Sequence, residues 1–175
     1  MTYSLYAATV RPFLQILGSV EDLVGKAEAF CSDRNLAAAD LIQARLAPDM
    51  LPFSYQVKST AEHSIGAIEA VRAGFSTPSL ERPPDSFAAL RQKVGSAKQA
   101  LEAIDPAEID GFMDRDVRFE FKTMRRDFKA PDFLTSYALP NFYFHATTAY
   151  GILRNKGLPI GKKDFLGRLA TAEAR

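Results

Sequence analysis

The sequence predicts a single-domain, all-α four-helix bundle with a short extra helix and a small β-hairpin before the last long helix. The length of 175 residues is the usual size of one domain. Four long segments carry apolar residues at alternating spacings of three and four, and one short segment has a two-residue period instead. A bundle is the economical way to bury four apolar stripes, so residues 1–175 are assigned to one domain.

The composition is that of an ordinary globular protein, with 47% apolar and 25% charged residues. The net charge of +1 gives no global basic field that would attract nucleic acid or a membrane surface. The single cysteine, Cys31, cannot form an internal disulfide. No apolar run approaches the roughly 18 residues that a membrane span requires. We therefore expect a cytoplasmic protein that binds neither nucleic acid nor membranes.

The first half of the chain begins with two predicted helices. Residues 3–31 form a long helix, in which Pro12 predicts a kink or a separate first turn. Residues 36–46 form a short helix that Pro48 ends. The core-facing stripe of the long helix consists of Tyr6, Val10, Phe13, Leu17, Val20, Val24 and Ala27.

The next long helix is expected over residues 50–73. Pro52 would stand in its first turn, where a missing N–H costs nothing, and Gly74 is a natural stop. Residues 75–85 contain three prolines and predict an exposed loop. The clearest apolar stripe of this helix consists of Val57, Ala61, Ile68 and Val71.

A further helix follows a capping residue, Asp85 or Ser86, and ends at Asp105-Pro106. Residues 105–115 are expected to form a loop. The stripe of this helix consists of Leu90, Val94, Ala97, Leu101 and Ile104.

The period then changes to two residues. Val117, Phe119 and Phe121 alternate with charged residues, which predicts a half-buried strand with residues 124–129 as its hairpin partner. Basic residues and phenylalanines at 115–129 could stack on nucleic-acid bases, but acidic residues dilute the charge and favour a solvated face.

The last long helix is expected to begin at a cap, Asp132, and to run to Asn155. Pro140 lies inside it and predicts a kink or a broken backbone hydrogen bond. From residue 160 onward the tail is basic and weakly patterned.

The two histidines, His63 and His145, are the clearest candidate functional residues. Each lies in a predicted long helix, and bundle cores build sites from facing helices. Gln56 shares a helix face with His63, while Asn141 and Ala149 share one with His145. If the two faces meet, they form a polar pocket for a small molecule or a divalent metal. The alternative is that both histidines are structural, because two are fewer than the three protein ligands usual for catalytic zinc.

Asp49 and Tyr143 are the other candidates for a catalytic role. Asp49 precedes the third helix and could act as a ligand or base at the mouth of the bundle, although helix capping is favoured. Tyr143, on the helix of His145, could donate a proton, although such tyrosines are more often core residues. If the protein performs chemistry, we expect His145 to be the general base or ligand, with Asp49 or a tyrosine hydroxyl as its partner.

Several runs together resemble the DinB/YfiT-like superfamily of metalloenzymes, in a bacterial domain-of-unknown-function branch. The most specific is PNFYFHATTAY at residues 140–150. The resemblance covers nearly the whole chain. The other matching residues are Ser4–Tyr6, Phe13-Leu14, Ala44–Met50, Gln56-Val57, Leu153-Arg154, Gly157, Gly161-Lys162 and Asp164–Gly167.

The resemblance implies a four-helix bundle, often dimeric, with a divalent metal such as zinc or nickel held by three histidines. One histidine comes from the second long helix, and two come from the last as a His-x-x-x-His pair. His63 could match the first and His145 one of the pair, but Ala149 and Asn141 stand where its partner would be. We therefore expect a homodimer whose pocket binds a small molecule or, weakly, a metal. The alternative is a non-catalytic dimeric interaction protein.

Overall fold

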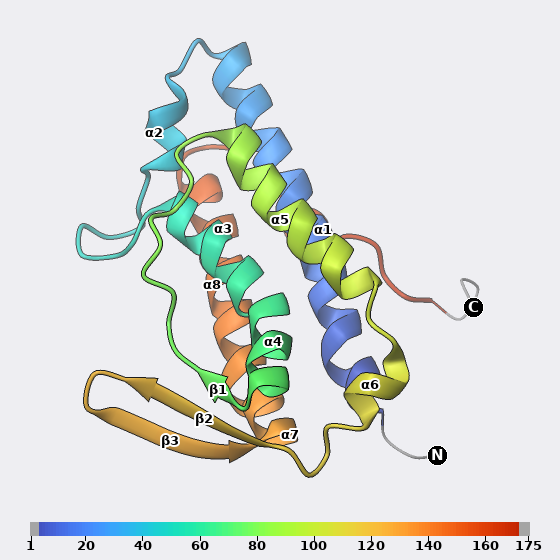
Figure 1. Ribbon diagram of the computed structural model, residues 1–175. Helices are drawn as coiled ribbons and strands as arrows, with labels where there is room; N and C mark the ends of the chain where they lie inside the picture. Colours follow the sequence, from blue (N-terminus) through green and yellow to red (C-terminus); the bar gives the residue numbers. More distant parts are fainter. Residues whose placement is uncertain (1–3, 172–175) are drawn as a thin grey trace.

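Four long helical segments of the computed structural model, which describes residues 4–171, pack around one core (Figure 1). The first segment contacts the second, the second contacts the third, the third contacts the fourth, and the fourth returns to the first. The long helical segments therefore form a closed ring around the core. The segments are α1 (Leu5–Asp33), α5 (Phe87–Glu102), α3 with α4 (Phe53–Glu62 and Ile65–Ala73), and α8 (Leu139–Asn155).

The core confirms the apolar stripes that the sequence predicts. Phe13 of α1 and Phe142 of α8 are fully buried and meet edge to face, with ring centroids 4.8 Å apart. The α1 stripe from Val10 to Ala27 is at most 1% exposed, and Tyr6 is partly buried against it. In residues 4–171 no helix is long and apolar enough to cross a membrane.

The fold is not strictly all-α, because a three-stranded sheet flanks one end of the bundle (Figure 1). The predicted hairpin is present as β2 (Asp116–Phe121) and β3 (Met124–Lys129). The expected loop after α4 contributes β1 (Phe75–Ser76), which pairs in parallel with β2 and places Ser76 opposite Phe119. A two-residue strand is too short to show a period, so the sequence could not reveal it.

The prediction of one continuous helix over residues 50–73 is wrong: the segment forms two helices, and the first begins later than predicted. Pro52 is the N-cap of α3 rather than a member of its first turn. The chain breaks between His63, the C-cap of α3, and Ser64, whose ψ of −89° is not helical. The Ser64 hydroxyl donates to the Ala61 carbonyl at 2.7 Å, which satisfies one carbonyl at the end of α3. The break leaves His63 at a helix end.

The last helix is also interrupted, and Asp132 does not cap it. Helical structure begins with the short α7 (Ala130–Asp132), whose N-cap is Lys129. A π-helix, η1 (Phe133–Ala138), follows before α8. Pro140 explains the π-helix, because proline has no N–H to donate and its ring clashes with the carbonyl four residues back. The wider turn, with the Leu139 N–H donating to the Leu134 carbonyl, relieves this conflict.

Other elements differ from the prediction at their bounds. The helix expected over 36–46 is reduced to α2 (Ala38–Ile42). The predicted loop over 105–115 contains α6 (Pro106–Asp110), capped by the Asp105 side chain. The tail contains α9 (Lys162–Leu166). Helix α1 continues through Pro12, while Tyr3, where its predicted range begins, lies outside the described residues.

Candidate functional site

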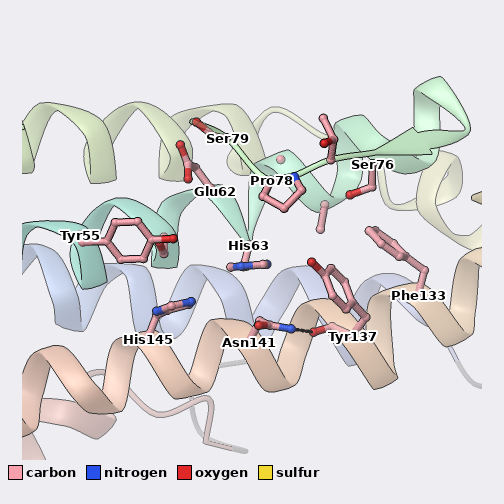
Figure 2. A pocket seen from close by; sticks show the side chains of 14 residues that line it. Tyr55, Glu62, His63, Ser76, Pro78, Ser79, Phe133, Tyr137, Asn141 and His145 are labelled. Atoms are coloured by element: carbon pink, nitrogen blue, oxygen red, sulfur yellow. Dashed lines mark hydrogen bonds between the residues drawn. The ribbon is translucent and has the colours of Figure 1, made fainter. Parts of the chain in front are cut away.

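A cavity of about 360 Å³ lies between α3, α4 and α8, beside the segment that follows β1 (Figure 2). Its volume is at the lower end of the range typical of small-molecule pockets. The residues that line it are Tyr55, Ser59, Glu62, His63, Gly66, Ala67, Ser76, Thr77, Pro78, Ser79, Phe133, Tyr137, Asn141 and His145.

The two histidines meet in this cavity. His63 comes from the end of α3, and His145 projects toward it from α8 (Figure 2). Their rings are nearly parallel, with an interplanar angle of 11° and ring centroids 5.4 Å apart. Residues 82 positions apart in the sequence therefore form one pair.

Gln56 determines the tautomer of His145, and therefore which ring nitrogen has a free lone pair. The Gln56 Nε2 donates to the Leu51 carbonyl at 2.9 Å, so its Oε1 is the atom that lies 2.7 Å from His145 Nδ1. Because Oε1 can only accept, Nδ1 carries the hydrogen, and Nε2 of the neutral ring keeps its lone pair. Gln56 does not line the cavity itself; it fixes the tautomer and orientation of a residue that does.

Burial keeps both imidazoles neutral. Desolvation lowers the pKa of His63 from its ordinary value of 6.5 to about 4. Desolvation, and secondarily the charge that His63 would carry, lower the pKa of His145 to about 4 as well. A charged imidazole is disfavoured where water is excluded, and two charged rings at this separation would repel each other. Both rings are therefore hydrogen-bond acceptors at neutral pH.

Tyr137 and Asn141 extend the site along the helix of His145. Desolvation, with a secondary effect of Tyr55, raises the pKa of Tyr137, so its hydroxyl stays protonated and can donate. The Asn141 side-chain amide donates to the Tyr137 carbonyl at 2.8 Å, as Figure 2 shows. The Tyr137 ring packs on Phe119 of β2 at a centroid separation of 5.0 Å. The sheet therefore supports the wall of the cavity.

Glu62 supplies the carboxylate of the cavity wall. Its Oε1 lies 3.3 Å from the Lys58 ammonium and 3.7 Å from that of Lys93. The Lys58 side chain is 1% exposed, and its Nζ makes no hydrogen bond to any described residue. A buried ammonium needs a nearby counter-charge, and Glu62 provides it.

Three predicted site residues lie away from the cavity. Asp49 stands in an exposed turn and is not a helix cap, because Pro52 caps α3. Tyr143 is 39% exposed, since positions two apart on a helix point in different directions and His145 faces inward. Ala149 is buried in the core one turn beyond His145. None of the three lines the cavity.

Sequence reasoning missed several lining residues. Ser59 lies one turn before His63, so helical spacing could have identified it. Tyr55 and Glu62 lie on the same helix but carry no motif that distinguishes them from surface residues. Ser76–Ser79 reach the cavity because β1 joins the sheet, and this long-range pairing has no local sequence signal.

The donor set for a metal is incomplete. Within residues 4–171 no group of three or more His, Cys, Asp or Glu side chains is placed to hold a metal ion. His63 and His145 fall short of the three protein ligands of a catalytic zinc site. The residues present therefore do not fit the three-histidine centre that the resemblance implies.

The fold is that of a DinB-like helical protein. The chain belongs to the family described as Domain of unknown function (DUF1993), which it matches over residues 5–166. It is similar to the crystal structure of a DinB family member protein from Shewanella denitrificans, with 29% sequence identity and a TM-score of 0.79. That similarity covers 95% of this chain and 94% of the other. No curated protein matches the chain.

Proposed function

We propose that the cavity binds a small polar molecule and that His145 accepts a hydrogen bond from it through Nε2. The observation that carries the proposal is the Gln56–His145 hydrogen bond, because a dedicated partner on Nδ1 leaves Nε2 in acceptor form. Histidines that bind metals are commonly oriented in the same way, by an outer residue that accepts a hydrogen bond from the other ring nitrogen.

The low pKa of His145 favours binding over proton transfer as its main role. A general base works best when its pKa lies near the operating pH, and a pKa of about 4 makes His145 a weak base. A neutral imidazole is nevertheless a good acceptor, and desolvation strengthens its hydrogen bonds to a bound molecule. The Tyr137 hydroxyl can supply a donor in the same cavity.

The variant His145→Asn tests this role. The asparagine Nδ2 can still donate toward Gln56, but the lone pair of the imidazole Nε2 is lost. We expect aromatic fragments that bind the native protein in ligand-observed NMR to bind this variant at least about tenfold more weakly, a change of about 1.4 kcal/mol. The melting temperature should change little.

Equal fragment binding by native protein and variant would contradict the proposal. So would a large loss of stability with no change in binding, which would indicate a structural histidine. Weak zinc or nickel binding by the histidine pair stays a prediction. Elemental analysis of protein purified without a histidine tag, after growth with both metals, tests it separately.

A further inference from the structure

We propose that the cavity recognises a small organic cation, an amine or ammonium group attached to a compact apolar body. This inference rests on the proposed function, because it names the chemical class of the ligand for the same cavity. Three features of the wall carry it: its unsatisfied acceptors, its aromatic rings, and a described lining without lysine or arginine.

The hydrogen-bond acceptors in the cavity wall favour a ligand that donates hydrogen bonds. His145 presents the lone pair of Nε2, because Gln56 occupies Nδ1. Neither carboxylate oxygen of Glu62 accepts a hydrogen bond from a residue within 4–171, although Oε1 contacts two lysines. An ammonium group has donors and no acceptor, so it matches these groups better than a carboxylate or a phosphate does.

Aromatic rings form much of the remaining surface. They follow one another along the cavity, from Tyr55 to His145 (centroids 6.0 Å apart), then to His63 (5.4 Å) and to Tyr137 (5.8 Å). Phe133 continues the row, 5.2 Å from Tyr137. Aromatic faces attract cations through their quadrupole, and tyrosine and phenylalanine are among the favoured partners. The two imidazoles are neutral and do not repel a positive charge.

The positive side chains near the site stand outside the cavity. No lysine or arginine is among its lining residues in the described part of the chain. Lys58 and Lys93 both reach Oε1 of Glu62, and Lys93 lines a separate cavity between α4 and α5 that Glu62 also borders. Glu62 therefore contacts both ammonium groups through Oε1, and the Lys58 ammonium also lies 5.7 Å from the centroid of the Tyr55 ring.

Three compounds of nearly equal size test the charge preference. Benzylamine is a cation at neutral pH, benzyl alcohol is its neutral analogue, and benzoate is an anion. Each is small enough for a cavity of about 360 Å³. Titration of the full chain, followed by NMR chemical shifts, should show that benzylamine binds at least about tenfold more tightly than benzyl alcohol and that benzoate binds most weakly.

Glu62→Gln should weaken benzylamine binding to about the level of benzyl alcohol and so remove the preference for the amine. This variant leaves Lys58 buried without its counter-charge and can fail to fold, so the double variant Lys58→Met/Glu62→Gln provides a second test. It removes both charges of the pair and should show the same loss of preference. Asp33→Asn, an exposed carboxylate at the end of α1, is the matched control and should retain the preference.

The outcomes separate this inference from the proposed function. Equal binding of all three compounds, with loss of binding in His145→Asn, would overturn the cation preference and leave the small-molecule pocket standing. Retention of the full preference in the double variant would also overturn the assigned role of Glu62. If none of the compounds binds at concentrations up to about 10 mM, the inference fails, and the comparison of fragment binding by native protein and His145→Asn then decides the proposed function.

Discussion

Acidification from about pH 7 to about pH 5 should lower the free energy of unfolding by roughly 2 kcal/mol for each of the two histidines. In the folded protein the pKa of His63 and that of His145 are both lowered from 6.5 to about 4. Between these values the unfolded chain binds more protons than the folded chain, so stability is full above about pH 6.5 and is lost as the pH falls toward 4.

A loss of stability between pH 7 and pH 5 can be attributed to His63 and His145, because they are the only histidines in the sequence. Urea unfolding at several pH values between about 5 and 7 measures the effect. In the double variant His63→Gln/His145→Asn the stability should vary little over the same range. A native protein whose stability is constant from pH 7 to 5 would contradict the burial of neutral histidines.

Truncation of Phe142 to alanine should cost about 3 to 5 kcal/mol of stability, because it removes a fully buried ring from the centre of the bundle. Phe142 packs edge to face on Phe13, and this contact joins α8 to α1. Phe142 also follows Asn141, a lining residue of the cavity, in α8. The packing that stabilises the fold therefore also orients the cavity wall.

Phe144→Ala is the matched control for this truncation. Phe144 lies two residues further along α8 and is 57% exposed, so its loss should change stability by no more than about 0.5 kcal/mol. Chemical denaturation of both variants provides the comparison. A cost below about 1 kcal/mol for Phe142→Ala would show that the α1–α8 contact is not part of the core.

Much of the fold could be predicted because helical and strand periods are local signals. The stripes of α1 and α5 and the alternation of Val117 and Phe119 follow directly from which side chains must leave water. The break at Ser64 and the π-helix before Pro140 could not be predicted from the sequence. A proline indicates that a helix is disrupted, but tertiary packing decides whether the helix kinks, breaks or widens into a π-helix. The homodimer stays a prediction.

Some residues of the candidate site could likewise be predicted from the sequence, and others could not. Helical spacing places Gln56 on one face with His63, but only the packing of α3 against α8 brings that face to His145. Asp49 and Tyr143 were chosen by chemical type without a geometric reason, and neither lines the cavity. Glu62 could not be distinguished from a surface carboxylate, because its partner Lys58 is buried only in the folded bundle.

The ionisation and tautomer of His145 test the central claim most directly, and the ¹⁵N chemical shifts of its ring report both as the pH is varied. We predict that His145 stays neutral down to about pH 5, with its hydrogen on Nδ1 and an unprotonated Nε2 whose shift responds to a bound fragment. A titration near the ordinary value of 6.5, or a ring that carries its hydrogen on Nε2, would contradict a buried acceptor oriented by Gln56.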